Sequence, residues 1–500
     1  RRIFADGIFQ VGNQYSKTWS FTDINYAIAS KEDKTSMFLD YSELLNALDS
    51  GASAKITIYN RRINKAEFER SVLLPDKADG LDEYRHEFNK MLTAQVTGTS
   101  NSIVRERYLT VSVVKRNPDE ARSYFARVGT DLVTHLAQLS SVANELTLTE
   151  RLHIFRDFFK AGEQAAAEFN IHEHAKRGQH FKDWFCPDSM EFAADHFKLD
   201  ARYGRVLYLQ DYASYIKDSF VSELCDLDRD LMLSIDILPV PTDEAARQLQ
   251  STLLGVETNV ANWQRRQNTN NNFTATIPYD MELQRKETKE MLDDLTTRDQ
   301  RMMFGLVTLV HLADNKEQLD SDTETLYSTA RKHLCQLSML RWQQKDGLDT
   351  VLPYGLRKIQ ALRTLTTEST AVLIPFRAQE IMEPNGLYYG QNAVSKNMIV
   401  ADRRLLLNGN SFRLGVSGSG KSMSAKEEIV QIALSTEDDI LILDPESEFG
   451  YLTEALGGEV IRISATSDTH INALDMDRAY GDERNPIVSK SEFVLSLFEQ

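Results

Sequence analysis

The sequence predicts an α/β protein, with an N-terminal α+β region of repeated strand–turn–helix units and a second domain built on a parallel sheet. Three observations support this prediction. Short apolar runs with a period of two lead into amphipathic helices with a period of about 3.6 at four places before residue 335. A long helical region separates the third place from the fourth. After about residue 365, short apolar strands alternate with helices around a glycine-rich turn.

The four strand–turn–helix units lie at 54–72, 107–128, 231–250 and 302–334. In the second unit, Asn117 and Pro118 form the turn, and acidic residues begin the helix, where they favour the helix dipole. In the third unit, Thr242 is a candidate N-cap. Strand–turn–helix is also the commonest unit of mixed proteins, so an internal repeat and four unrelated units both remain open.

The region between the third and fourth units has the pattern of a helical hairpin. Helical sequence continues to about Trp263, is interrupted by the polar stretch 264–276 and resumes at 278–300. The polar tip is either a partner contact or a solvated loop, and a solvated loop is the commoner outcome.

Residues 135–200 are predicted to be helical and are rich in aromatic residues, for example at 148–159 and 188–197. Three histidines in this region, His172, His174 and His180, raise the question of a metal site. No carboxylate–His–His spacing on a predicted helix accompanies them. A surface loop with incidental histidines is therefore the better interpretation.

From about residue 365 the pattern changes, and we expect the main domain boundary there. The run 371–376 reads as a strand, and 386–392 with 397–403 read as an antiparallel pair joined by a short polar turn. The predicted domains are an N-terminal α/β domain, then the helical hairpin with a second strand–helix subdomain, then a partial phosphate-loop domain, at 1–240, 241–365 and 366–500.

The stretch GVSGSGKS at 415–422 fits the pattern G-x-x-x-x-G-K-[ST], which predicts a nucleotide-phosphate site. Glycines let the backbone curl so that successive N–H groups point at phosphate oxygens. Lys421 would reach the β- and γ-phosphates of ATP, and the Ser422 hydroxyl would bind Mg²⁺. The residues predicted to bind the nucleotide are Gly415, Ser417, Gly418, Ser419, Gly420, Lys421, Ser422 and Met423.

The context of this stretch strengthens the prediction. An apolar strand at 411–414 enters the loop, a helix at 423–435 leaves it, and a buried strand at 440–443 ends in Asp444. A helix at about 447–456 and a strand at 459–463 follow, which gives the order β-loop-α-β-α-β that begins a phosphate-loop NTPase sheet.

Asp444 and Glu446 are candidate catalytic residues together with Lys421. They follow the predicted central strand, and the carboxyl ends of such strands face the ligand. Asp444 could hold a Mg²⁺-bound water or orient the attacking water. The alternatives are a carboxylate that stabilises a helix N-terminus and a plain turn acid after Pro445.

A hydrolysing phosphate-loop ATPase needs a later apolar strand that ends in Asp or Asp-Glu. Residues 471–483 are loop-like and 489–500 read as one amphipathic helix, so that strand has no counterpart in this sequence. We therefore expect the chain to be a piece of a longer ATPase. In this 500-residue form it should bind nucleotide poorly or not at all and hydrolyse it negligibly.

Composition limits the classes of function. The net charge is −17 with no long Lys/Arg block, which gives no global attraction to nucleic acid. The three cysteines, Cys186, Cys225 and Cys335, are far apart, so a reducing cytoplasmic compartment is expected. The longest apolar run, 302–313, is shorter than the roughly 20 residues of a membrane span, and the N-terminal stretch has no signal-peptide pattern.

Residues 375–475 resemble the large ATPase of conjugative type IV secretion systems, of the TraC/TrbE kind found in Gram-positive integrative elements. The resemblance rests on the Tyr-Tyr-Gly hairpin before the loop and on Asp-Pro-Glu-x-Glu-Phe and Leu-Gly-Gly-Glu-Val-Ile after it. It implies a RecA-like ATPase of the HerA/FtsK superfamily, commonly hexameric, that uses ATP and Mg²⁺. Residues 1–365 match this family in layout only.

The resemblance also implies partners and a location. The N-terminal domain would dock onto membrane channel proteins at the inner face of the cell membrane, with the chain cytoplasmic and contacting the transferred DNA or protein only indirectly. By position, Lys421 and Ser422 take the phosphate and magnesium roles, and Asp444 takes the acidic place after the second strand.

Three functions remain in competition on the sequence. The first is a motor that energises conjugative transfer of DNA or protein. The second is a hexameric DNA translocase of the same superfamily, which should carry a basic DNA-facing surface. The third is a scaffold for channel assembly in which the nucleotide only regulates docking. A small-molecule kinase fits least, because no arginine-rich lid follows the loop.

Overall fold

The computed structural model describes residues 2–62, 72–98, 103–160, 176, 178, 180–213, 215–269, 276–383, 385–464, 466–469, 472–475 and 486–499. The chain forms two compact units. Unit 1 consists of Arg1–Leu73 and Phe88–Leu407, and unit 2 consists of Leu74–Glu87 and Asn408–Gln500. The predicted boundary near residue 365 lies inside unit 1.

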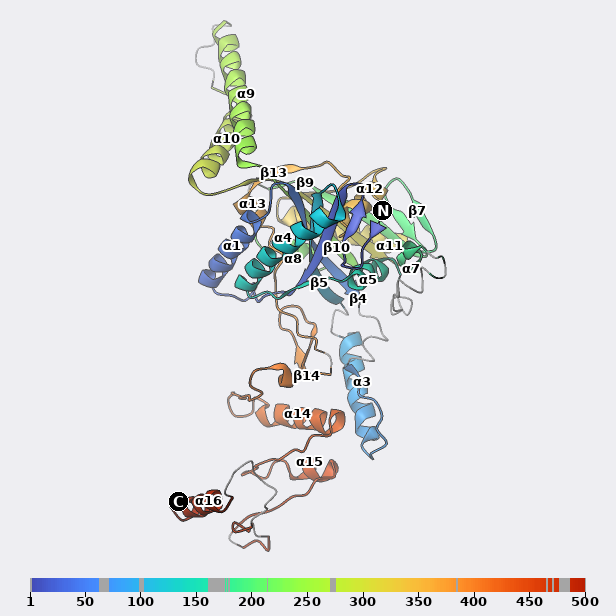
Figure 1. The fold of residues 1–500 in the computed structure, drawn as a ribbon, viewed down its shortest axis with the longest axis vertical. Coiled ribbons are helices and arrows are strands. Elements are labelled where there is room, and N and C mark those ends of the chain that lie inside the picture. Colours follow the sequence, from blue (N-terminus) through green and yellow to red (C-terminus); the bar gives the residue numbers. More distant parts are fainter. Residues whose placement is uncertain are drawn as a thin grey trace. The chain divides into compact units, whose positions relative to one another are not determined.

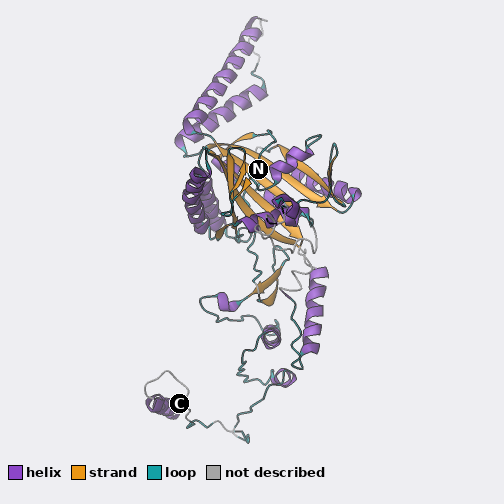
Figure 2. Ribbon diagram, turned by 45° about the vertical axis from the view of Figure 1, so that its right-hand side comes forward, coloured by secondary structure: helices purple, strands orange, loops and turns teal. Residues whose placement is uncertain are grey.

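Unit 1 is built on a large antiparallel sheet flanked by helices (Figures 1 and 2). The strands are β1 Arg2–Ile3, β2 Phe9–Val11, β3 Gln14–Phe21, β4 Ala52–Arg62, β5 Ile103–Val114, β6 Ala143–Glu145, β7 Met190–Phe192, β8 Phe197–Leu199, β9 Arg202–Asp211, β10 Leu231–Pro239, β11 Met302–Ala313, β12 Gln336–Met339 and β13 Arg363–Thr366. Their order is β1-β2-β3-β5-β4-β10-β11-β9-β8-β7, with β6 on β3, β12 on β9 and β13 on β11. The mixed α/β prediction is confirmed, with antiparallel rather than parallel pairing throughout this sheet.

The central part of the sheet has the same strand order on both sides of its middle. From the outside of the sheet toward its middle, one half contains β3, β5 and β4, which are the first, third and second of these strands along the chain. The other half, also from the outside inward, contains β9, β11 and β10, which are again the first, third and second along the chain. The two sets meet through β4 and β10, where Ile56 lies opposite Ile235.

Two layers of helices cover the two faces of the sheet. One core cluster joins the sheet to α1 Lys31–Asn46, α4 Pro118–Gln138, α8 Phe220–Leu224, α11 Lys316–Lys332 and α13 Thr367–Ala371. The other joins it to α5 Leu148–Phe159, α7 Phe181–Phe185 and α12 Gln344–Val351. Both faces are therefore buried, which explains why the central strands read as nearly continuous apolar runs.

Several predicted elements are confirmed. Strand–turn–helix units are formed by β5 with α4, by β10 with α9 Thr242–Thr269 and by β11 with α11. Asn117 caps α4 and Asn315 caps α11, each accepting a hydrogen bond from the backbone N–H three residues on. Thr242 is the first residue of α9 rather than its N-cap. In the first unit β4 is formed, and 63–71 lie outside the described residues.

The helical hairpin is also confirmed. α9 pairs with α10 Tyr279–Thr297 (Figure 1). Ala245 and Leu249 on α9 pack with Leu292 on α10. α9 runs to Thr269, beyond the predicted end near Trp263, because the polar residues that follow still have ordinary helix propensity. Residues 270–275 at the tip lie outside the described residues.

Two predictions of secondary structure are wrong. Residues 188–197, predicted to be helical, instead form the hairpin of β7 and β8, because a short apolar run does not reveal its period. Residues 371–376 are not a strand, since α13 ends at Ala371 and an irregular segment follows. The helix at 148–159 is confirmed as α5, which begins with a capping box between Thr147 and Glu150.

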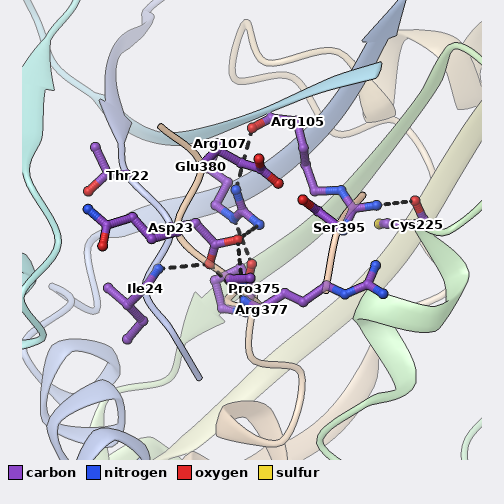
Figure 3. Close-up of polar contacts among 12 residues, drawn as sticks. Thr22, Asp23, Ile24, Arg105, Arg107, Cys225, Pro375, Arg377, Glu380 and Ser395 are labelled. Atoms are coloured by element: carbon purple, nitrogen blue, oxygen red, sulfur yellow. Dashed lines mark hydrogen bonds and ion pairs between the residues drawn. The ribbon is translucent and has the colours of Figure 1, made fainter. Parts of the chain in front are cut away.

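The irregular segment after α13 is held by polar contacts that occupy its backbone (Figure 3). Asp23 accepts hydrogen bonds from the N–H groups of Arg377 at 2.7 Å and Ala378 at 3.0 Å. The buried Arg107 guanidinium pairs with Asp23 and donates to the Pro375 carbonyl at 2.8 Å. These groups are consequently unavailable for a strand ladder, and Phe376 nearby is buried in the core.

One ion pair is buried at the middle of the sheet. Lys55 on β4 and Asp236 on β10 lie opposite each other, 3.4 Å apart between Nζ and Oδ1. Lys55 also donates to the carbonyl of Leu356 at 3.0 Å. Burial lowers the pKa of Lys55 and raises that of Asp236, and the attraction between them opposes both shifts.

The remaining elements lie at the end of unit 1 or in unit 2. In unit 1, β14 Leu387–Gln391 and β15 Met398–Ala401 form the predicted antiparallel pair, and the short 3₁₀ helix η2 Arg403–Leu405 follows. Helix α3 Asp82–Gly98 begins in unit 2 and continues in unit 1. Unit 2 also contains α14 Lys421–Ser435, α15 Gly450–Ala455 and α16 Pro486–Glu499. No helix within the described part of the chain is long and apolar enough to cross a bilayer.

Candidate nucleotide-binding site

The predicted phosphate loop is a tight turn that leads directly into α14. Gly418 and Gly420 have φ values of +78° and +91°, in the left-handed region that residues with a Cβ rarely adopt. Gly420 is the N-cap of α14, and Lys421 is its first residue. At Gly415 an added Cβ would lie 2.4 Å from Ser419 Oγ, so the loop folds back closely on itself there.

The ammonium of Lys421 folds back over the loop. Its Nζ donates hydrogen bonds to the carbonyl oxygens of Gly415 at 2.7 Å and Val416 at 3.4 Å. The Ser419 N–H closes the turn on the Val416 carbonyl at 3.2 Å. A positive charge is thus held against two backbone carbonyls of the loop, with the side chain exposed to solvent.

The helix that follows supplies further donors. The first N–H groups of an α-helix have no acceptor within the helix, and they carry part of the positive end of the helix dipole. In α14 these groups belong to Lys421, Ser422 and Met423, whose side chains are exposed. The predicted binding residues 415–423 therefore form one continuous loop and helix start that fits an anion.

Two contacts fasten the start of the loop to its helix. Arg413 pairs with Glu428, and its Nε donates to Ser424 Oγ at 3.2 Å. Glu428 is buried, so the guanidinium compensates a carboxylate that has left water. No local sequence pattern marks this pair, although Arg413 lies in the segment that enters the loop.

The other end of α14 is capped by a segment distant in the sequence. Arg85 donates from Nε to the Leu434 carbonyl at 3.0 Å and is held by Asp79 and Asp82. Lys77 donates to the Ser435 carbonyl at 3.1 Å. Cations at the C-terminal carbonyls offset the negative end of the helix dipole, so 77–85 stabilise the helix that carries Lys421.

Asp444 lies at the start of a turn that leads into α15. Its Oδ2 accepts a hydrogen bond from the Phe449 N–H at 2.8 Å. Backbone N–H groups of this turn, that of Phe449 first, lower the pKa of the Asp444 carboxyl, which keeps it ionised. In the structure Asp444 is therefore a carboxylate that stabilises a turn. Its remaining lone pairs can still accept a hydrogen bond from a metal-bound water.

The Asp444 turn is linked to the loop helix. The Lys426 ammonium on α14 lies 5.3 Å from the centre of the Phe449 ring, at the far end of that turn. Glu446 lies within the turn with its side chain exposed. The chain therefore brings the carboxylate segment 444–449 against α14.

The strands predicted around the loop are absent from the described residues of unit 2. Residues 411–414, 440–443 and 459–463 are irregular, and most of their apolar side chains are exposed, Leu414 at 92% and Leu441 at 90%, whereas Ile442 is half-buried. A strand of a parallel sheet requires hydrogen-bonded neighbours and covered faces, and these segments have neither. The helices predicted at 423–435, 447–456 and 489–500 are confirmed as α14, α15 and α16.

The histidine cluster gives no metal site in the part of the chain that the structure describes. His180 caps the short helix α7, and no group of three metal-ligating side chains occurs among the described residues. His172 and His174 lie outside the described residues.

Comparisons with known proteins add no relative. No protein-family model matches the sequence, and no curated protein matches it.

Proposed function

We propose that the chain binds ATP with Mg²⁺ at the loop 415–422. The observation that supports this most strongly is the position of Lys421, directly after left-handed Gly420 and at the first position of a 15-residue helix. A lone helix start or a lone lysine would be weak support. Here a glycine loop, the start of a helix and a lysine ammonium that folds back over the loop occur within the same nine residues.

Each residue has a separate role in this proposal. The N–H groups of Gly418 and of Gly420 to Met423 bind phosphate oxygens, and the Lys421 ammonium exchanges its two carbonyl partners for the β- and γ-phosphates. The Ser422 hydroxyl binds Mg²⁺, which neutralises phosphate charge when bound. Asp444 would hold a metal-bound water, and Glu446 is a second candidate to orient the attacking water.

We further propose that unit 2 contributes to a RecA-like sheet. The segments 411–414, 440–443 and 459–463 are apolar and exposed, so pairing them would bury a large apolar surface. Until they pair, the loop is held by α14, by the capping contacts of that helix and by Arg413, as far as the described residues show. This is consistent with weak nucleotide binding by the 500-residue chain.

The biological role that we propose is an ATP-driven motor for a conjugative type IV secretion channel. The sequence resemblance across 375–475 supports it, and unit 1, a sheet with helices on both faces, is large enough to be the domain that docks onto channel proteins. On this proposal the working form is a homo-oligomer, commonly a hexamer, at the inner face of the cell membrane. The matching strand order on both sides of the sheet supports an internal repeat in the docking domain.

Transfer of DNA between cells tests the motor proposal. Lys421→Ala should abolish transfer while channel assembly survives, because phosphate binding is lost and unit 1 is untouched. Lys490→Ala, which changes another lysine of unit 2 on α16, should transfer normally. Normal transfer by Lys421→Ala would contradict the motor and favour a scaffold, and binding of duplex DNA that weakens steeply with salt would favour a DNA translocase.

A further inference from the structure

Unit 1 contains an apolar cavity of about 220 Å³ that the nucleotide site does not use. Both ends of the sheet reach it. β1 and β2 contribute Ile3 and Phe9 from one end of the strand order, and β7 contributes Met190 and Phe192 from the other. Helices α5, α7 and α12 supply the remaining walls.

Aromatic side chains form a large part of the wall. The Phe155 ring lies 5.6 Å from the rings of both Phe185 and Tyr354, measured between centroids. Leu152 and Leu348 also line the cavity and are buried. Such a wall offers aromatic edges and faces to an entering ring, which is an arrangement that aromatic pairs favour.

The size of the cavity suits one large side chain. A cavity of roughly 150 Å³ lined by Leu, Ile and Phe binds benzene, whereas sites for drug-sized ligands have about 300–1,000 Å³. The cavity of 220 Å³ lies between these sizes. Met190 and Phe192, each 39% exposed, extend the apolar surface outward from it.

The lining residues that carry charge are mostly basic. Arg2, Lys182 and Lys345 line the cavity, although the net charge of the chain is −17. Asp349, the single acid among the described lining residues, accepts from the Tyr354 hydroxyl and pairs with Lys358. Carboxylates on an incoming molecule would consequently find uncompensated positive charge at this site.

We propose that this cavity binds an aromatic side chain of a partner protein, on a segment with acidic residues beside that side chain. The aromatic ring fills the cavity and packs against Phe155, Phe185 and Tyr354. The flanking carboxylates pair with Lys182 and Lys345 at the surface. The small volume of the cavity favours a single side chain over a lipid acyl chain. This proposal does not depend on nucleotide binding at the loop 415–422.

Cys186 allows a test on the unmodified chain. It lines the cavity and is half-buried, whereas Cys225 and Cys335 are buried, so iodoacetamide should modify Cys186 first. The probe is a pentapeptide with one tryptophan between two glutamates on each side. At millimolar concentration it should slow the alkylation of Cys186 at least fivefold, and the same peptide with lysines in place of glutamates should not.

A charge-reversal variant sharpens the test. The double variant Lys182→Glu with Lys345→Glu changes two surface side chains and should exchange the preference, so that the lysine peptide protects Cys186. Lys31→Glu on α1, away from the cavity, should behave as the unmodified chain. Equal protection by both peptides, or protection by neither, would overturn the proposal. Protection by vesicles with about a third phosphatidylserine, but not by the peptide, would replace the protein partner by a lipid.

Discussion

His311 on β11 gives a pH dependence of stability that can be calculated from the structure. Its side chain is fully buried, and its Nε2 lies 3.1 Å from Thr323 Oγ1 on α11. Burial, and then the neighbouring Arg205 guanidinium, lower its pKa to about 3, while Asp320 acts weakly in the opposite direction. Replacing this residue by His311→Gln keeps a polar group for Thr323 and removes the titration.

The sign of the effect follows from proton binding in the two states. Between about pH 3 and 6.5, the unfolded chain protonates this histidine and the folded chain does not. The free energy of unfolding therefore falls as the pH falls, by about 1.4 kcal/mol per unit. From pH 6.5 to 5.0 the loss in the free energy of unfolding is about 2 kcal/mol. Above pH 6.5 His311 is neutral in both the folded and the unfolded chain, and its titration no longer changes the stability.

Urea denaturation at pH 7.5 and pH 5.0 measures this effect. All four tryptophans of the chain lie in unit 1, so their fluorescence follows the unit that contains His311. At pH 7.5 the Gln variant should be less stable than the unmodified chain. By pH 5.0 its relative stability should have improved by about 2 kcal/mol. Parallel pH dependence of the two chains would refute the reasoning, and the exposed His180→Asn variant serves as the control.

Three further predictions concern the loop helix and the sheet. Arg85→Met should speed hydrogen exchange of the last-turn amides of α14 by about tenfold, because it removes the charge-assisted bond to the Leu434 carbonyl; unchanged exchange would contradict the capping role. Asp236→Asn should destabilise unit 1 by about 3 to 5 kcal/mol in urea, since Lys55 would remain buried without its carboxylate, and a loss below 1 kcal/mol would contradict this. Gly420→Ala should weaken nucleotide binding and lower the helicity of α14 measured by hydrogen exchange, because its φ of +91° disfavours a Cβ.

Local features of the fold could be predicted from the sequence because they depend on neighbouring residues. Asn117 and Asn315 each precede a helix and cap it, and the periodic runs of β5 and β11 form strands. The sheet order could not be predicted, since β4 meets β10 across more than a hundred residues. The prediction of a strand at 371–376 was wrong for the same reason. The carboxylate that accepts from the backbone just after this segment belongs to Asp23, 354 positions away from Arg377.

The candidate site shows the same division. The loop geometry at Gly418, Gly420 and Lys421 follows from residue types in a fixed spacing, and the structure has the expected left-handed glycines before a helix. The capping of α14 by Arg85 depends on a contact over 349 positions, which no local pattern contains. The strand predictions at 411–414 and 440–443 depended on sheet neighbours that a run of apolar residues does not specify.

Titration of the chain with a fluorescent ATP analogue in the presence of Mg²⁺ tests the central claim, an anion site formed around Lys421. We expect saturable binding with a Kd of about 0.1 to 1 mM, weakened at least tenfold in Lys421→Ala and unchanged in Lys490→Ala. If Lys421→Ala binds the analogue as tightly as the unmodified chain, the phosphate site is not at this loop and the proposed ATPase function fails with it.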